Sequence, residues 1–430
     1  DARRAGRELM STSRAIVDAL RDLGGPTDPQ LLAEQASSST TPMELATLSK
    51  DDEDRVAPML ANRPGIVAIK IPDMFPTDPG FAPAVVGEVK KSVGDNLSGA
   101  PGWRVVSVNQ NGVETDVLNE VAPDPAPSVS ITLDRAVQNA AQNAVNGQGR
   151  KAMLVVIKPS TGDILAVAQN GAADADGPTA TMGLYPPGST FKIVTAGAAI
   201  DRNMATPNTL LGCPGEIDIG HRRIPNYDRF DLGVVPMSKA FANSCNTTFA
   251  ELASRMPPRA LNQTAAIFGI GRDYVVDGLP TVSGQVPPTV DLAELTEDGF
   301  GQGKVLASPF GMALAAATVA AGATPVPRLI VGHNTAVTGD AKTISPTMLD
   351  GLRAMMRMVV TNGTAKDLAG YGDVRGKTGE AEFEGGSHAW FAGYRGDMAF
   401  AALIVGGGSS EYAVRMTRQM FDSLPDGYLA

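Results

Sequence analysis

The sequence is poor in the residues that most often bind metal ions and nucleic acids. It contains two cysteines and three histidines in 430 residues, and none of them is spaced as in a metal-binding motif. Lysine and arginine number 36 against 46 acidic residues, which gives a net charge of −10. No basic cluster interrupts this acidic balance, so the sequence predicts no metal site and argues against a nucleic-acid-binding protein.

Long apolar segments are also absent. No run approaches the roughly 20 apolar residues that a membrane-spanning helix needs. The most apolar stretch, Met312 to Ala323, is short and rich in alanine, so we expect a buried helix there. Because the chain opens at Asp1 without an apolar leader, we expect that an export signal or lipid anchor has been removed from it.

The residues that are present indicate a globular protein of roughly two or three domains. Hydrophobic residues make up 43% of the chain and charged residues 19%, which is an ordinary globular composition. We interpret residues 1–126 as a separate N-terminal region that ends at a proline-rich linker. Within it we expect two helices, Arg3–Leu23 and Ser49–Leu60 with Ser49 as N-cap; two strands, Val67–Ile71 and Trp103–Val108; and a loop, Ala36–Thr41.

Residues 127–430 have the pattern of a second domain of mixed α+β class. A helix, two strands, a long helical segment, three strands and a closing helix follow one another. Their order predicts an antiparallel sheet assembled from both ends of the segment. The expected elements are helices Leu133–Val145 and Tyr412–Leu424 and strands Met153–Ile157, Ile164–Ala168, Val374–Phe383, Ala389–Tyr394 and Met398–Val405.

The first of three short motifs in this domain is Ser189–Lys192. Tyr-Pro-Pro-Gly precedes it and breaks any earlier helix, so Ser189 begins a new one. The free N–H groups of a helix start favour a developing negative charge beside the Ser189 hydroxyl. Lys192 follows one turn later on the same face, where burial and neighbouring positive charge would let it act as a general base.

The second and third motifs are Ser244–Asn246 and Lys377–Gly379. Two loop residues at i and i+2 can point into one cleft, so Ser244 is placed to pass a proton to a leaving amine and Asn246 to bind a substrate amide. Lys377 and Thr378 lie on an expected strand, along which a peptide could form main-chain hydrogen bonds. Gly379 leaves room for a peptide to approach that strand closely.

Each motif is weak evidence when it is taken alone. A Ser-x-x-Lys sequence usually caps a surface helix, and Ser107–Asn109 repeats the Ser-x-Asn pattern upstream without any catalytic context. The order, the spacing and the Pro-Pro-Gly segment before the first motif together indicate an acyltransferase that uses a serine nucleophile.

The two cysteines leave two interpretations open. A Cys213–Cys245 disulfide would form if the protein works outside the cytoplasm. We favour the other interpretation, in which Cys245 packs as a small buried residue beside the candidate site.

With these motifs the chain resembles a class B penicillin-binding protein, and within that family the mycobacterial penicillin-binding lipoproteins. The similarity begins near Ser128 and extends to the C-terminus. It includes Tyr185–Lys192, Phe300–Gly303 with Ala307–Pro309 after it, and Trp390–Tyr394. The Arg-Gly-x-Ile-x-Asp-Arg motif of the family's N-terminal pedestal is missing. Residues 1–126 are therefore interpreted as an incomplete pedestal or dimerisation-type region.

The resemblance implies a transpeptidase domain with a five-stranded antiparallel sheet flanked by helices and a helical insert. It further implies a peptidoglycan D,D-transpeptidase that acts on the extracytoplasmic side of the membrane and is held there by a lipid anchor. Ser189 would attack a D-Ala-D-Ala donor stem peptide, and the amine of an acceptor stem would resolve the acyl-enzyme. The N–H groups of Ser189 and Glu380 would form the oxyanion hole.

The same resemblance implies neither a metal nor a cofactor. It implies that β-lactams bind covalently. It also implies a protein partner, either a glycosyltransferase or a component of the division machinery. Roles in cell division, cell shape and antibiotic resistance belong to the same expectation.

Glu380 departs from the family pattern, which commonly has threonine after Lys-Thr-Gly. A carboxylate beside a strand that binds carboxylates removes a donor and adds repulsion, at a cost on the order of 1–3 kcal/mol if it is poorly solvated. We therefore predict slow acylation by most penicillins. In the alternative interpretation Glu380 turns outward to solvent and has no such effect.

Three other functions remain open, two of which use the same motifs. A D,D-carboxypeptidase would use water as the acceptor and release D-Ala without forming cross-links. A serine β-lactamase needs a dedicated deacylating base, and the sequence offers no convincing one. A division scaffold or β-lactam-binding protein would depend on the fold more than on turnover.

Overall fold

The computed structural model describes residues 2–39, 41–46, 48, 50–61, 63, 65–66, 76–94, 99, 102–109, 114–124, 126–339 and 343–428. The chain forms two compact units, residues 1–77 and 78–430. The domain boundary expected between residues 126 and 127 lies inside the second unit and stays a prediction.

The first unit contains three helices, α1 (Ala2–Ala19), α2 (Pro29–Ser38) and α3 (Lys50–Leu60). Helices α1 and α3 confirm the two that the sequence predicted. Ser49, the expected cap of α3, and the expected strand Val67–Ile71 lie outside the described residues.

Helix α2 contradicts the loop that was expected from Ala36, because the helix continues to Ser38. Asp28 begins this helix, and its carboxylate accepts hydrogen bonds from the backbone N–H groups of Gln30 and Leu31. The three helices share an apolar core that includes Ile16, Leu20, Leu32 and Val56.

The second unit begins with helix α4 (Pro83–Val93) and a two-stranded hairpin, β1 (Trp103–Val108) and β2 (Glu114–Val121). Strand β1 was predicted from its apolar alternation. Strand β2 was not, because its sequence, Glu-Thr-Asp-Val-Leu-Asn-Glu-Val, is mostly polar.

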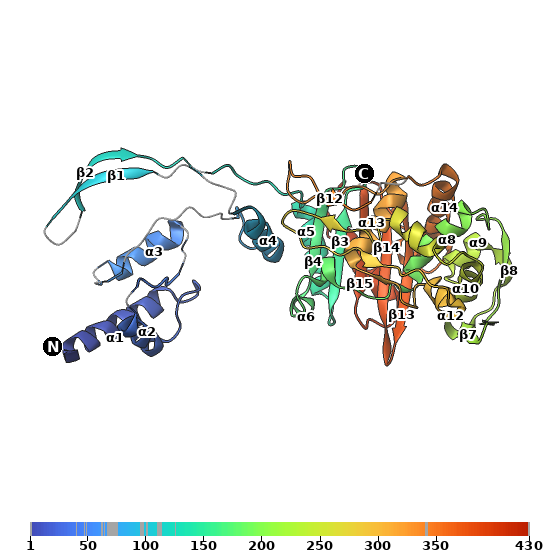
Figure 1. The fold of residues 1–430 in the computed structure, drawn as a ribbon, viewed down its shortest axis with the longest axis horizontal. Helices are drawn as coiled ribbons and strands as arrows, with labels where there is room; N and C mark the ends of the chain where they lie inside the picture. The colour runs from blue at the N-terminus through green and yellow to red at the C-terminus, as the bar shows by residue number, and fades with distance from the viewer. Residues whose placement is uncertain are drawn as a thin grey trace. The chain divides into compact units, whose positions relative to one another are not determined.

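A five-stranded antiparallel sheet organises the rest of this unit, with strand order β13-β14-β15-β3-β4 (Figure 1). Strand β3 pairs with β15, so strands from both ends of the segment form one sheet, and the predicted α+β class is confirmed. The strands are β3 (Ala152–Ile157), β4 (Ile164–Gln169), β13 (Val374–Phe383), β14 (Gly386–Arg395) and β15 (Met398–Ile404).

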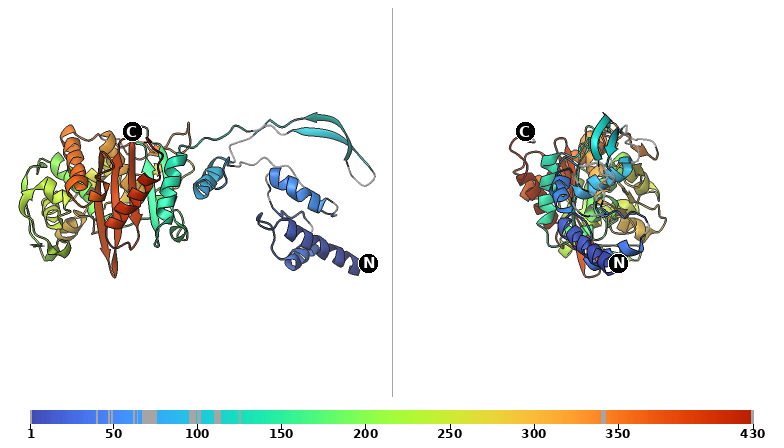
Figure 2. Two further views of the ribbon diagram at one scale, coloured as in Figure 1. Left: turned by 180° about the vertical axis from the view of Figure 1, so that it is seen from behind. Right: turned by 90° about the vertical axis from the view of Figure 1, so that its left-hand side faces the viewer.

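Helices cover both faces of the sheet. Figure 1 views the face on which α13 (Pro309–Ala321) packs, and Figure 2 shows α15 (Glu411–Asp422) across the opposite face, where α5 (Arg135–Asn146) also packs. All seven residues of β15 are buried, as expected for a strand covered on both sides. Helix α13 confirms the buried helix predicted from Met312. No helix in the described part of the chain is long and apolar enough to cross a membrane.

The segment between β4 and β13 is mainly helical and contains most of the candidate site. Its helices are α6 (Gly171–Asp174), α7 (Thr179–Met182), η2 (Gly188–Phe191), α8 (Lys192–Asp201), η3 (Tyr227–Arg229), α9 (Met237–Ala242), α10 (Asn246–Ser254), α11 (Ala260–Ile267), α12 (Leu292–Asp298), α13, α14 (Pro346–Asn362) and η4 (Lys366–Leu368). Its short strands are β5 (Leu210–Cys213), β6 (Glu216–Ile219), β7 (Arg222–Pro225), β8 (Gly233–Pro236), β9 (Tyr274–Val275), β10 (Gly284–Gln285), β11 (Leu306–Ala307) and β12 (Ala336–Val337).

Candidate active site

Ser189 lies in a tight turn that begins a helix. The 3-10 turn η2 continues directly into α8, which confirms the helix start expected at this residue. Gly188 opens the turn with φ of +52°, and a Cβ atom there would lie 2.3 Å from the carbonyl oxygen of Glu380. Glycine alone satisfies both conditions without strain or collision. The backbone before Ser189 therefore packs directly against strand β13.

A second glycine supports the same turn. The N–H of Gly188 donates a hydrogen bond to the carbonyl oxygen of Gly301 at 2.9 Å, and a Cβ atom on Gly301 would collide with the Gly188 backbone. The loop around Gly301 is held by Asp298, whose carboxylate accepts the N–H of Lys304 at 2.8 Å. Burial raises the pKa of Asp298 to about 6.

Lys192 is fully buried beside Ser189. Its Nζ lies 2.8 Å from Ser189 Oγ, 2.7 Å from the carbonyl oxygen of Ser244 and 2.7 Å from Asn246 Oδ1. The last two atoms can only accept, so they take two N–H groups of Lys192. In the neutral amine the remaining lone pair faces the Ser189 hydroxyl. Burial, followed by the charge of Lys377, lowers the pKa of Lys192 well below its ordinary value.

Ser244 connects two buried lysines. Its Oγ lies 3.4 Å from Lys192 Nζ and 3.0 Å from Lys377 Nζ. Ser244 occupies the turn between α9 and α10 with φ of +63°, a left-handed conformation that is unfavourable for a residue with a side chain. In this turn the hydroxyl and the carbonyl oxygen of Ser244 both face Lys192.

Asn246 begins α10, and a side chain from another loop holds it there. Asn226 Oδ1 accepts hydrogen bonds from the N–H groups of Asn246 at 2.8 Å and Thr247 at 3.1 Å. The residue before α10, Cys245, provides no side-chain cap, so Asn226 replaces the missing N-cap. Asn226 is buried, and its Nδ2 donates to the carbonyl oxygens of Pro214 and Phe230.

The structure corrects the interpretation of Cys245 as a free buried thiol. Cys213 and Cys245 form a disulfide with a Cα–Cα distance of 6.2 Å, and both are fully buried. The bond joins the end of β5 to the residue between Ser244 and Asn246. The sequence offered only a spacing of 32 residues, and the close approach depends on the packing of the β5–β8 pair against α9 and α10.

Lys377 and Thr378 lie on β13, the strand at one edge of the sheet. Besides Ser244, the Lys377 Nζ donates to the carbonyl oxygen of Thr378 at 2.9 Å, and burial lowers the pKa of Lys377 to about 7. The Thr378 hydroxyl shares a 2.5 Å hydrogen bond with the hydroxyl of Thr364. Gly379 makes room for the nucleophile turn, because a Cβ atom there would lie 2.8 Å from the carbonyl oxygen of Pro187.

Glu380 is half-buried, and it binds the start of a helix. Its Oε1 accepts a hydrogen bond from the N–H of Ser410 at 2.8 Å, directly before α15. The positive end of that helix offsets part of the carboxylate charge. The alternative in which Glu380 turns outward to solvent does not describe this arrangement, whereas its predicted effect on acylation stays a prediction.

The structure thus brings the side chains of Ser189, Lys192, Ser244, Asn246 and Lys377 into one hydrogen-bonded cluster. Sequence reasoning missed Asn226 and Thr364, which hold members of the three motifs from outside them. No group of His, Cys, Asp or Glu among the described residues is arranged to hold a metal ion.

Comparison with known proteins places this geometry in a family. The model of the penicillin binding protein transpeptidase domain matches residues 152–424. Peptidoglycan D,D-transpeptidase PbpA of Mycobacterium tuberculosis is 29% identical over 238 residues, which cover 48% of this chain and 48% of PbpA. The chain spans about half or less of the length of such curated relatives.

Similar solved structures include two penicillin-binding proteins. Penicillin-binding protein A from Mycobacterium tuberculosis, as a ceftriaxone acyl-enzyme complex, aligns with a TM-score of 0.60 and 25% identity over 70% of this chain and 81% of that one. Penicillin-binding protein PBP2 of Helicobacter pylori, in complex with MreC, aligns with a TM-score of 0.76 over 98% of this chain and 93% of that one. The identity to this second protein is 18%, so that likeness concerns the fold alone.

Proposed function

Because the chain belongs to the family of penicillin-binding transpeptidase domains, we propose that it is a peptidoglycan D,D-transpeptidase that forms an acyl-enzyme at Ser189. The observation that supports this most directly is the contact of Ser189 Oγ with a buried lysine of lowered pKa. β-Lactams would acylate the same atom.

In the first step, neutral Lys192 takes the proton of Ser189 as Oγ attacks the carbonyl carbon of the donor D-Ala-D-Ala bond. The hydroxyl lies within hydrogen-bonding distance of the amine, and Ser244 O and Asn246 Oδ1 fix the amine's other two directions. Lys192 becomes an ammonium that these two acceptors stabilise, so proton transfer needs no rearrangement of the base.

Negative charge on the carbonyl oxygen would be stabilised by the N–H groups of Ser189 and Glu380. The close packing of Gly188 on the Glu380 backbone supports this assignment, because it brings the nucleophile turn and the strand together. Strand β13 has one free edge, where the donor peptide would add main-chain hydrogen bonds beside Thr378 and Gly379.

The leaving amine of D-Ala needs a proton, and Ser244 is placed to deliver it. Its hydroxyl lies between Lys192 and Lys377, so a proton can pass from Lys192 through Ser244 to the amine. The amine of an acceptor stem peptide then attacks the acyl-enzyme, and the same groups move the proton in the opposite direction. Asn246 would bind the amide of the donor peptide.

Glu380 is proposed to slow acylation by β-lactams. It supplies no hydroxyl for the carboxylate of the drug, and its own charge remains close to the Thr378 hydroxyl that would bind it. We expect Glu380→Thr to raise the acylation rate by about tenfold, which corresponds to 1.4 kcal/mol. An unchanged rate in this variant would overturn this proposal.

Location and partners follow from the same family membership. We propose that the protein works at the extracytoplasmic face of the cell membrane under a lipid anchor, in cell division or cell shape. A glycosyltransferase or another component of the wall-synthesis machinery is the partner we expect.

The test is intact-protein mass spectrometry after incubation with β-lactams, on the wild type and on Ser189→Ala. One drug mass added to the wild type and absent from the variant supports the acyl-enzyme. Synthetic donor and acceptor stem peptides then separate the activities. Cross-linked dimer supports transpeptidation, whereas D-Ala release without dimer would make the protein a carboxypeptidase. Growth supported fully by Ser189→Ala would favour a scaffold.

A further inference from the structure

A second polar site lies away from the serine motifs, in a cavity of about 630 Å³ between α14 and the adjoining ends of β13 and β14. Its volume is in the range of small-molecule sites, roughly 300–1,000 Å³. Three arginines and two aspartates line it, together with one tyrosine and small residues. The charged and aromatic residues are Asp350, Arg353, Arg357, Asp373, Arg375 and Tyr394.

The arginines reach the cavity from two elements. Arg353 and Arg357 are four residues apart on α14 and therefore share one helix face. Arg375 stands on β13 directly opposite Tyr394 on β14, so these two side chains share a face of the sheet. The three guanidinium groups thus line one space, although their segments are far apart in the sequence.

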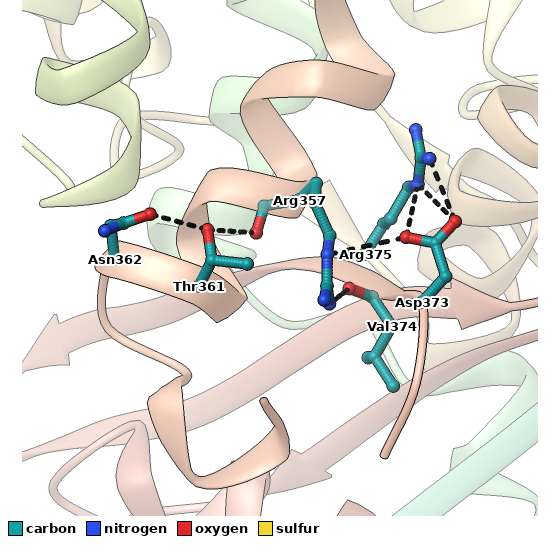
Figure 3. A network of polar contacts seen from close by, with 6 residues as sticks. All are labelled: Arg357, Thr361, Asn362, Asp373, Val374 and Arg375. Atoms are coloured by element: carbon teal, nitrogen blue, oxygen red, sulfur yellow. Dashed lines mark hydrogen bonds and ion pairs between the residues drawn. The ribbon is translucent and has the colours of Figure 1, made fainter. Parts of the chain in front are cut away.

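The carboxylate of Asp373, a residue of the chain itself, already binds two of these arginines (Figure 3). Asp373 accepts hydrogen bonds from Arg375 Nε at 3.1 Å and Nη2 at 2.9 Å, and Arg357 Nε lies 3.5 Å from its Oδ1. The hydrogen bonds from Arg375 are the main cause that lowers the pKa of Asp373. The Asp373 side chain is nevertheless 62% exposed, so solvent or a ligand can reach it.

Two features indicate that the cavity has unused binding capacity. Each guanidinium has five N–H donors, and the bonds described for Arg353, to the carbonyl oxygens of Val319 and Ala320, use only part of them. The Tyr394 hydroxyl is buried and forms no well-aligned hydrogen bond in the part of the chain that the structure describes, although the Arg375 guanidinium lies close enough to interact with its oxygen. A buried hydroxyl in this state is uncommon, because leaving it unpaired costs about 1–3 kcal/mol.

We propose that this cavity binds the oxyanion of a small ligand, a carboxylate or a phosphate, with Arg353 and Arg357 as its charged donors and the Tyr394 hydroxyl as its neutral donor. Arginine forks match the geometry of both anions. The ligand competes with Asp373 for the guanidinium group of Arg357. Asp350 also lines the cavity and adds a second negative charge that opposes binding of an anion.

The experiment is isothermal titration calorimetry of the whole chain with two probes, inorganic phosphate and N-acetylglutamate. Saturable binding of either probe is expected, and the probe that binds more tightly identifies the oxyanion. Arg357→Gln should weaken binding at least tenfold. The control Arg415→Gln removes a surface arginine of α15 that pairs with Glu411 and should have no effect.

Two further variants separate binding from folding. Tyr394→Phe removes a hydroxyl that forms no well-aligned hydrogen bond, so its melting temperature should stay close to that of the wild type while affinity falls about three- to tenfold. Asp373→Asn removes the competing charge and should tighten binding severalfold, an effect that structural damage would not produce.

Binding at the serine site has to be distinguished, because Lys377 is also a cation. Lys377→Gln should retain the calorimetric signal that Arg357→Gln loses. The proposal is overturned if neither probe binds saturably, if both Tyr394→Phe and Arg357→Gln bind as tightly as the wild type, or if Lys377→Gln abolishes the signal.

Discussion

The side-chain oxygen of Asn226 accepts the backbone N–H of Asn246 at 2.8 Å and so fixes the first residue of α10. Asn246 in turn accepts a hydrogen bond from Lys192 at 2.7 Å. A buried residue outside the three motifs is therefore linked to the general base through one intermediate residue. Because Asn226 positions Asn246 and through it Lys192, it should affect the rate of acylation as well as the free energy of unfolding.

Asn226→Ala should slow acylation and destabilise the fold, because the N–H groups of Asn246 and Thr247 lose their acceptor and the carbonyl oxygen of Phe230 loses its donor. We expect a loss of about 2–4 kcal/mol in the free energy of unfolding from these unpaired groups. Asn226→Asp keeps the acceptor but loses both donors, and it should acylate faster than the alanine variant. Urea unfolding and the rate of penicillin acylation measure the two effects. Equal acylation rates for both variants and the wild type would exclude a positioning role.

Lys192→Gln should reduce the acylation rate by about 10²–10⁴-fold, the usual contribution of a general base. The glutamine amide stays polar and neutral, but it cannot take the Ser189 proton. Stopped-flow or time-resolved mass spectrometry with a penicillin measures the rate. The matched control is Lys366→Gln, an exposed lysine of η4. If both variants acylate at the wild-type rate, Lys192 is not the base.

The free energy of unfolding should increase as pH rises from about 7 towards 10. Burial lowers the pKa of Lys377 in the folded protein to about 7, from an ordinary value of 10.5. In this interval the unfolded chain binds more protons than the folded one, so raising the pH favours folding. Lys377→Met should have a shallower increase than the wild type in urea unfolding across this range. Parallel curves would mean that Lys377 keeps an ordinary pKa in the folded protein.

Reduction of the Cys213–Cys245 disulfide should lower the free energy of unfolding by about 3–4 kcal/mol, as the chain-entropy relation gives for a loop of this length. Acylation should also slow, because Cys245 lies between Ser244 and Asn246. Urea unfolding and acylation with and without dithiothreitol test this. The Cys213→Ser/Cys245→Ser variant should be insensitive to the reductant. If dithiothreitol changes unfolding and acylation equally in both proteins, the effect does not come from the Cys213–Cys245 disulfide.

The sequence predicted the elements whose pattern is local and strong. Strand β13 was predicted over its whole length from Val374 to Phe383, and α13 was expected from its alanine-rich apolar run. The three motifs were found because their order and spacing are preserved along the chain. Strand β2 and helix α2 were missed because polar residues dominate both, and propensity alone is a weak guide there.

Contacts between distant segments could not be predicted in the same way. Asn226 follows β7 in a loop without periodicity, and nothing nearby indicates that it caps α10. The two cysteines gave a separation along the chain and no information about distance in space. The partner of Glu380, Ser410, lies 30 residues further on, directly before α15.

The pairing of β3 with β15 has a consequence for how the protein is made. Strand β3 emerges from the ribosome long before β15, and the whole helical segment up to Asn362 is synthesised between them. The β3–β15 pair therefore cannot form before β15 has been synthesised. Late closure of such non-local contacts slows folding and leaves apolar strands exposed in the meantime. Strand β15 ends at Ile404, and α15 completes the cover of the sheet. Removing even part of the last 30 residues should therefore impair folding much more than the small number of residues lost would suggest.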